Sequence, residues 1–376
     1  MTIPKYSVVI PCRNEELTIG ICIKKIQKVF EKNKIKGEII VSDSSSDRSA
    51  EIAESLGAKV IKHNKVGYGN AYLEGFKHVK GKYIIIGDAD NTYDFFEIPK
   101  FIESLKSNDF IIGNRFKGKM EKGSMPWLHR YIGNPILSLI LRILFKTKIK
   151  DTHCGFRAIK KEELDKLNLV TPGMEFASEM IIKSIKNNLK IKEIPVNYGK
   201  RLGESKLRSF NDGWKHLRFM LLYSPNYLFF LPGIGLFSLG FILMLILLGG
   251  PIYIGRIMVD IHSMVLGSLF SIIGLQIIFL GLFAKTYAIT HKLNKNDKFL
   301  NKVYKYLNLE KGIIIGGLIL FIGFLINFDI LLAWILNNFR GMGKVRIVIF
   351  GSTIMVLGLQ AIFSSFFLSI LGIENK

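Results

Sequence analysis

The sequence is poor in cysteine and, relative to its basic residues, poor in acidic ones. Its 376 residues include only three cysteines, Cys12, Cys22 and Cys154. Such an odd and sparse set excludes a disulfide framework and is typical of a reducing compartment. The 52 Lys and Arg residues outnumber the 30 Asp and Glu residues, which leaves a formal net charge of +22. This balance indicates an anionic partner, and the long apolar segments favour lipid or phosphate over nucleic acid.

Two familiar patterns are also missing. No Gly-x-Gly-x-x-Gly follows the first predicted strand, and the later Gly67-Tyr68-Gly69 lacks the third glycine, which argues against a dinucleotide-binding fold. No signal-peptide pattern opens the sequence, because residues 1–5 lead directly into a strand-like run.

The N-terminal part alternates short apolar runs with helical patterns. Such alternation predicts an α/β domain whose mainly parallel sheet is covered on both faces. The expected strands are residues 6–10, closed by Pro11, and residues 38–41, 58–62, 82–87 and 110–112.

Two carboxylates end the fourth of these runs, in Ile86-Gly87-Asp88-Ala89-Asp90. Because side chains alternate along a strand, Asp88 and Asp90 lean the same way at the edge where α/β sheets bind ligands. Carboxylate and diphosphate oxygens suit a hard cation such as Mg²⁺ or Mn²⁺. The spacing by itself equally fits a solvated acidic turn.

Several motifs in a fixed order carry a family resemblance over residues 6–232. They are Ile-Pro-Cys-Arg-Asn-Glu-Glu (10–16), Ser-Asp-Ser-Ser-Ser-Asp (42–47), Gly-Asp-Ala-Asp (87–90), Gly-Asn-Arg-Phe (113–116), Asp-Thr-His-Cys-Gly-Phe-Arg (151–157), Gly-Met-Glu-Phe (173–176) and Arg-Leu-Gly-Glu-Ser-Lys-Leu (201–207). The set resembles the inverting GT-A glycosyltransferases of family 2, of the dolichyl- or polyprenyl-phosphate sugar synthase type. The resemblance implies transfer of a hexose from a nucleotide sugar, of the GDP-mannose or UDP-glucose type, to a polyprenyl phosphate, with a divalent metal.

The resemblance, the spacing of the two aspartates and the chemistry of phosphates together indicate site residues. The nucleotide sugar would contact Pro11, Asn14, Glu15, Asp43, Asp88, Ala89, Asp90, Arg201 and Lys206. The metal would be held by Asp88 and Asp90, with Thr92 as a third candidate, and catalysis is assigned to Asp90, Arg115 and Glu179.

Phosphate chemistry adds the acceptor side of the site. Arginine forks suit phosphate oxygens, so Arg115 and Arg130 are predicted to bind the lipid phosphate, and we expect Arg115 at the sheet edge rather than in a core. A phosphomonoester loses its second proton near pKa ~6 and arrives as a competent nucleophile, so no protein base is required. Glu179, and after it Asp151, would be the base if one were needed, whereas we expect His153 to be structural.

The sequence departs from the family pattern at two positions. Ser42 stands where the second strand usually ends in the first of two aspartates, and Thr92 stands where a metal-binding glutamine is common. These departures leave the sugar and the nucleotide open.

The apolar residues concentrate after position 224. We predict a catalytic domain over 1–204, basic amphipathic helices over 205–225 and a membrane domain over 226–376, with spans near 227–249, 263–284, 312–336 and 346–371. Residues 285–311 carry seven lysines, so the positive-inside rule places this loop, both termini and the catalytic domain on the cytoplasmic face of a cell membrane. Residues 127–148 are amphipathic and fit either a core helix or a helix at the membrane surface.

Two other functions compete with a single-sugar transferase. A processive polysaccharide synthase would carry Gln-x-x-Arg-Trp, but none of the three tryptophans follows an arginine. A catalytically inactive membrane-anchored binder of nucleotide sugar or lipid carrier stays open because of Ser42 and Thr92.

Overall fold

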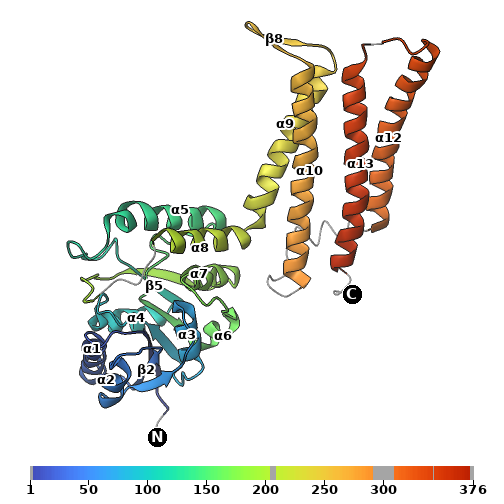
Figure 1. Cartoon of the computed structure of the whole chain (residues 1–376). Coiled ribbons are helices and arrows are strands. Elements are labelled where there is room, and N and C mark those ends of the chain that lie inside the picture. The colour runs from blue at the N-terminus through green and yellow to red at the C-terminus, as the bar shows by residue number, and fades with distance from the viewer. Residues whose placement is uncertain (1–2, 204–208, 291–308, 342, 373–376) are drawn as a thin grey trace. The chain divides into compact units, whose positions relative to one another are not determined.

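The computed structural model describes residues 3–203, 209–290, 309–341 and 343–372 (Figure 1). The chain forms two compact units, Met1–Tyr223 and Ser224–Lys376. Lys206 and most of the lysine-rich loop, residues 291–308, lie outside the described residues.

A seven-stranded sheet in the order β3-β2-β1-β4-β6-β5-β7 forms the centre of the first unit. Its strands are β1 (Tyr6–Cys12), β2 (Gly37–Asp43), β3 (Lys59–Lys62), β4 (Tyr83–Ile86), β5 (Phe110–Asn114), β6 (Arg157–Lys160) and β7 (Ile191–Pro195). All pairings are parallel except those of β6, which runs antiparallel between β4 and β5. The prediction of a mainly parallel α/β sheet is confirmed.

The first strand continues past the point where the sequence predicts its end. Pro11 lies inside β1 and pairs in register with Ser42, instead of closing the strand. On the other side of β1 the pairing with β4 stops at Val9. Proline cannot donate a ladder hydrogen bond, and it is tolerated here because β1 has only one neighbour at this level.

Helices cover both faces of the sheet. Their bounds are α1 (Ile19–Lys32), α2 (Ser49–Ser55), α3 (Tyr68–Phe76), α4 (Ile98–Leu105), α5 (Asn134–Phe145), α6 (Lys161–Leu167), α7 (Phe176–Lys186) and α8 (Ser209–Leu222). The helix α1 contacts α2 and α4, while α7 contacts α3, α6 and α8. Nearly every Val and Ile residue of strands β1, β4 and β5 is fully buried between these layers, as their continuous apolar runs require.

The amphipathic segment 127–148 packs on the core, as one of its two predicted roles requires, and the membrane-surface role stays a prediction. In α5, Leu141 is fully buried against the core, whereas Ile136 and Ile143 are about half exposed on the opposite side. Trp127, just before the helix, is 66% exposed. The helix α8 behaves in the same way, since Met220 is buried and Trp214 is exposed. Each of these helices therefore packs on the core with one face and presents apolar side chains with the other.

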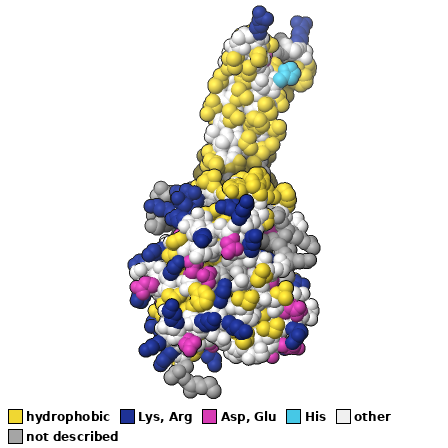
Figure 2. Space-filling model, turned by 90° about the vertical axis from the view of Figure 1, so that its left-hand side faces the viewer, with side chains coloured by type: hydrophobic (Ala, Val, Ile, Leu, Met, Phe, Trp, Pro, Cys, Tyr) yellow, Lys and Arg dark blue, Asp and Glu magenta, His cyan; other side chains and the backbone are white. Residues whose placement is uncertain are grey.

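Among its described residues, the second unit holds four helices long and apolar enough to span a membrane. They are Asn226–Leu247 (a π-helical turn and α9, Leu231–Leu247), α10 (Ile261–Thr290), α12 (Leu309–Leu336) and α13 (Val345–Gly372). A two-stranded hairpin, β8 (Ile252–Ile254) with β9 (Ile257–Val259), connects α9 to α10. Hydrophobic side chains cover the face of the helices that Figure 2 shows, and Lys or Arg side chains stand at its tip.

Candidate active site

The two carboxylates of the Asp-x-Asp motif follow β4 directly. Asp88 Oδ1 accepts hydrogen bonds from the hydroxyls of Tyr68 (3.1 Å) and Tyr72 (3.3 Å). Both tyrosines lie on α3, four residues apart and so on one helix face. Burial, and after it the charge of Asp90, raise the pKa of Asp88 to about 7, although the two hydroxyls act in the opposite direction.

Asp88 is further confined by the loop before β6. A Cβ atom added to Gly155 would lie 2.6 Å from Asp88 Oδ2 and 3.0 Å from the Tyr68 hydroxyl. The Gly155 amide donates to the hydroxyl of Tyr93 at 2.7 Å. Only a residue without a side chain allows this loop to approach the carboxylate so closely.

Asp90 is held from two directions. Its Oδ1 accepts bonds from the Thr92 amide (3.1 Å) and from the Thr92 hydroxyl (2.6 Å). Its Oδ2 lies 2.9 Å from Nη1 of Arg201, and the other arm of that guanidinium pairs with Glu15. Thr92 therefore orients Asp90, and Arg201 supplies positive charge where the sequence predicts a metal and a diphosphate.

The ends of β1 and β2 form the neighbouring wall. Asp43 accepts hydrogen bonds from the amide (3.2 Å) and hydroxyl (2.6 Å) of Ser45, and the Ser45 hydroxyl in turn accepts a bond from the Asn14 amide at 2.8 Å. Asn14 adopts a left-handed φ of 54° and accepts a bond from the Ser46 amide. The loop after β1 and the loop after β2 thus brace each other beside Asp43.

Ser42, one of the two departures from the family pattern, has a specific partner. It is fully buried, and its hydroxyl lies 3.1 Å from Nε2 of His63, which follows β3. The serine and histidine together fill the position next to Asp43 at the carboxyl edge of β2.

Arg115 lies in a buried ion pair that local sequence patterns do not reveal. The residue is 6% exposed, and its side chain donates from Nε and Nη2 to the two oxygens of Asp151, at 2.8 and 2.7 Å. The Arg115 amide also donates to Asp151, and the guanidinium lies over the ring of Tyr198. Arg115 directly follows β5 at the carboxyl edge of the sheet, as expected, but the expectation that it lies outside the core is wrong, because the loop before β6 closes over it.

The structure places the remaining predicted residues in other settings. Glu179 is fully buried and its carboxylate is occupied by the amides of Val170 and Thr171, the Thr171 hydroxyl and Lys183. Arg130 lies in the turn before α5, with its guanidinium over the ring of Tyr131. Pro11 lies in β1 and Ala89 is buried between the two aspartates.

His153 has a buried environment that fits the structural role expected for it. Its ring packs edge-on against His216 of α8 at 4.4 Å, and its Nδ1 lies 3.0 Å from the Thr152 hydroxyl. Burial, and after it the neighbouring His216, hold the pKa of His153 well below its usual range.

Tyr68, Tyr72 and Gly155 are the site residues that the sequence reasoning missed. In the sequence, Gly67-Tyr68-Gly69 indicates only the start of a helix, and Gly155 is only one member of a longer motif. The available signal was the spacing of two tyrosines four residues apart in a predicted helix. Only the order of the strands in the sheet shows that this pair of tyrosines faces Asp88.

The donor atoms near Asp88 and Asp90 fit a hard divalent cation. Two carboxylates lie together, and burial, followed by the charge of Asp90, raises the pKa of Asp88. Within the described ranges, no group of three or more His, Cys, Asp or Glu side chains is arranged to hold a metal. A cation here would therefore depend on ligand oxygens as well as on the protein.

Comparison with known proteins identifies the family of the chain. Residues 7–167 match the family described as Glycosyl transferase family 2, and residues 282–372 match Glycosyltransferase family 2 C-terminal transmembrane region. The low-salt glycan biosynthesis hexosyltransferase Agl6 of Haloferax volcanii is 38% identical over 371 residues, covering 98% of this chain and 89% of that protein.

The chain belongs to glycosyltransferase family 2. It is a membrane glycosyltransferase, and the family resemblance inferred from its motifs is confirmed. A second relative of this glycosyltransferase, the dolichyl-phosphate hexose transferase of Haloferax volcanii, is 30% identical over 56% of this chain and 90% of its own. Among solved structures, glucosyl-3-phosphoglycerate synthase from Mycobacterium tuberculosis aligns with 59% of this chain and 80% of its own at a TM-score of 0.47 and 20% identity.

Proposed function

We propose that this glycosyltransferase moves a hexose from a nucleotide sugar to the phosphate of a polyprenyl lipid, with inversion at the sugar. The observation that carries the proposal is the meeting of Asp88, Asp90 and Arg201 at the carboxyl edge of the sheet. The names of the two Haloferax relatives, a hexosyltransferase and a dolichyl-phosphate hexose transferase, support the sugar and lipid classes.

The donor side needs compensation for a leaving diphosphate. Asp88 and Asp90 would hold Mg²⁺ or Mn²⁺, which when bound neutralises the diphosphate as a Lewis acid. Thr92 keeps Asp90 oriented, and Arg201 can exchange its contact with Asp90 for one with a phosphate oxygen. Asp43, Asn14 and Glu15 line the adjacent edge, where we place the nucleoside, with Pro11 and Ala89 contributing backbone.

The acceptor supplies its own nucleophile. A phosphate oxygen of the lipid forms a bond to the anomeric carbon, the bond from that carbon to the diphosphate breaks, and the nucleoside diphosphate leaves. The dianionic phosphate needs no base at neutral pH. This fits the environment of Glu179 and Asp151, whose carboxylates are already occupied by structural donors.

The exposed apolar faces of α5 and α8 support a reaction at a lipid surface. Trp127, Ile136 and Trp214 are each exposed, and basic residues such as Arg142 and Lys215 lie among them. Apolar groups enter the head-group region and basic ones meet anionic lipids.

We propose that this surface is cytoplasmic, as the charge of the lysine-rich loop indicates. The cysteine of a Lys295→Cys variant should then resist an impermeant thiol reagent in intact cells, and it should react once the cells are permeabilised. Ready labelling in intact cells would overturn the orientation.

The activity is tested with membranes that contain the full-length protein. They are incubated with a panel of nucleotide sugars and a polyprenyl phosphate, with Mn²⁺ or with excess chelator. We expect one sugar per lipid, no transfer in chelator, and no transfer by Asp90→Asn. Asp109→Asn, which changes a carboxylate beside the far end of β5 that pairs with Lys160, is the matched control. A polymer would favour a processive synthase, and binding without turnover would favour an inactive carrier.

A further inference from the structure

The two membrane hairpins carry the same sequence pattern. Residues 267–279 and residues 351–363 both read Gly-Ser-x-x-x-x-x-Gly-Leu-Gln-x-Ile-Phe, with an offset of 84 residues. The first copy lies in α10 and the second in α13. The pattern indicates that α9–α10 and α12–α13 are repeats of one helical hairpin.

The glycines of the pattern make equivalent contacts in both hairpins. In each hairpin, two glycines of one helix face two glycines of the other. The approach is close: a Cβ atom added to one glycine of a pair would lie within 3.0 Å of the backbone oxygen of the other glycine. The pairs are Gly240 with Gly267, Gly233 with Gly274, Gly323 with Gly351 and Gly316 with Gly358. Small residues let membrane helices approach closely, so both hairpins are assembled in the same register.

Equivalent residues of the two repeats meet where α10 packs against α13. Gln360 Nε2 donates to Gln276 Oε1 at 3.1 Å, and the rings of Phe283 and Phe367 lie 4.7 Å apart. Each of these residues contacts its own repeat partner, as expected at a two-fold interface. The hairpins are therefore related by an approximate two-fold axis along the seam between α10 and α13.

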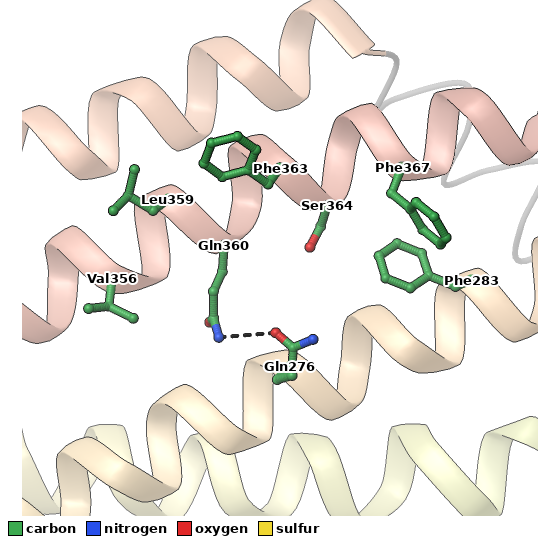
Figure 3. A pocket seen from close by; sticks show the side chains of 8 residues that line it. All are labelled: Gln276, Phe283, Val356, Leu359, Gln360, Phe363, Ser364 and Phe367. Carbon is green, nitrogen blue, oxygen red and sulfur yellow. Dashed lines mark hydrogen bonds between the residues drawn. The ribbon is translucent and has the colours of Figure 1, made fainter.

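A cleft of about 360 Å³ opens beside the glutamine pair (Figure 3). Gln276 and Gln360 lie near the middle of their helices, so the cleft is at mid-span. Three of the side chains that line it are polar, those of Gln276, Gln360 and Ser364. The others are aromatic or aliphatic: Phe283, Val356, Leu359, Phe363 and Phe367.

The polar groups of the cleft have unused hydrogen-bonding capacity. Gln360 Oε1 is buried and has no hydrogen-bond partner within the described part of the chain. The amide nitrogen of Gln276 points away from Gln360, and the Ser364 hydroxyl faces the same space in Figure 3. Unpaired polar atoms are costly in a bilayer because no water compensates them. A hydroxyl group, which both donates and accepts, would satisfy this set.

We propose that the cleft binds the hydroxylated head of a lipid-linked sugar and that the membrane unit thereby reorients this lipid across the bilayer. The inference rests on the proposed function, since the enzyme would make such a lipid. The aromatic walls would contact the apolar face of the sugar ring, while the two amides and Ser364 would hydrogen-bond its hydroxyls.

Further polar contacts along the same seam support a route for a polar head. Arg346 pairs with Asp260 at 2.5 Å beside the first turn of α10, and the hydroxyls of Ser268 and Thr353 lie 2.7 Å apart. Near the opposite end Thr290 donates to the backbone oxygen of Leu371 at 3.0 Å. The glutamine pair lies between these contacts, so hydrogen-bonding groups recur along the length of the two helices.

The test uses purified full-length protein in phosphatidylcholine vesicles. The probe is a radiolabelled hexosyl-phosphoryl-polyprenol added to the vesicles, and impermeant periodate measures how fast inner-leaflet sugar becomes accessible. We expect wild-type protein to accelerate this exposure over empty vesicles. The double variant Gln276→Leu/Gln360→Leu should be roughly tenfold slower, as expected for the loss of one to two hydrogen bonds in the membrane. Val356→Phe, which adds bulk to the cleft wall and leaves both amides in the sequence, should also slow it.

Controls separate recognition from simple helix packing. Asn327→Leu removes a polar contact between α12 and α13, outside the seam, and should reorient the probe at the wild-type rate. Three results would each overturn the proposal. The control variant could be slowed as much as the glutamine variant, wild-type protein could fail to accelerate the exposure, or it could accelerate a choline phospholipid equally. Because the lipid-linked sugar is supplied, the result does not depend on synthesis. Sugar transfer, measured on the same samples, can fail or succeed independently.

Discussion

The guanidinium of Arg201 forms an ion pair with the carboxylate of Asp90, with 2.9 Å between Nη1 and Oδ2. The same guanidinium pairs with Glu15, so one cation joins carboxylates from the ends of β1 and β4. Arg201 lies just before the segment 204–208 that the structure does not describe. It thus compensates the carboxylates and can transfer its charge to a bound diphosphate.

We predict that Arg201→Ala weakens the donor side of the reaction. Losing a charge-assisted hydrogen bond costs about 1.5–3 kcal/mol, or roughly tenfold to a hundredfold in nucleotide-sugar affinity. The lipid KM should change little, and Arg130→Ala should show the opposite pattern. Titrating a nucleoside diphosphate against both variants separates them. Wild-type affinity in Arg201→Ala would mean that the arginine only holds the carboxylates together.

We predict that metal binding tightens as pH rises through about 7, the raised pKa of Asp88. A carboxylate must lose its proton to bind a cation, so the neutral form below this pH competes with the metal. Tyr72→Phe removes a hydroxyl that lowers this pKa and should move the transition to higher pH. Calorimetric titration of Mn²⁺ over a pH series measures it, with Tyr83→Phe at the start of β4 as the control. A pH-independent affinity would contradict the prediction.

The raised pKa of Asp88 also has a consequence for stability. A carboxyl group that holds its proton more tightly when folded stabilises the fold below its ordinary pKa of 3.8, and this contribution is lost as pH rises to about 7. Asp88→Asn should therefore raise the thermal midpoint of the metal-free protein above pH 7 while abolishing transfer. A lower midpoint in this variant would show that the charge of Asp88 is already well compensated.

Gly155 should tolerate no side chain. A Cβ atom there would lie 2.6 Å from Asp88 Oδ2, and relieving such overpacking costs about 1–3 kcal/mol. Because the added Cβ atom would clash with the carboxylate of Asp88, we expect Gly155→Ala to lose most of its sugar-transfer activity while its free energy of unfolding falls only by the amount above. Gly213→Ala is the matched control, since no atom lies within 4 Å of its added Cβ and the position is inside α8. That variant should be neutral or about 0.5–1 kcal/mol more stable.

The ion pair of Arg115 and Asp151 should be a determinant of stability. Both side chains are buried, so removing either one leaves an uncompensated charge and costs about 3–5 kcal/mol. Replacing both together, with Arg115→Met and Asp151→Leu, should recover most of that loss. Denaturant midpoints of the two single variants and the double variant measure the coupling. Additive losses would show that the two charges act independently.

The sequence alone determined the features that depend on short-range patterns. Apolar runs of strand length, each followed by a helical pattern, predicted a parallel α/β sheet, and the position of Asp88 and Asp90 after one run placed them at its carboxyl edge. Long apolar segments predicted the membrane helices. The repeated Gly-Leu-Gln pattern in α10 and α13 was equally present in the sequence.

Only the tertiary structure decided which charges compensate one another. Because β6 enters antiparallel between β4 and β5, the loop before it brings Gly155 to Asp88 and Asp151 to Arg115. The partner of Asp90 is 111 residues away in sequence. No local pattern encodes such pairings, since they follow from strand order. Likewise, Gln276 and Gln360 became an interacting pair only when their helices packed side by side, because a repeat in sequence does not state which of its copies meet.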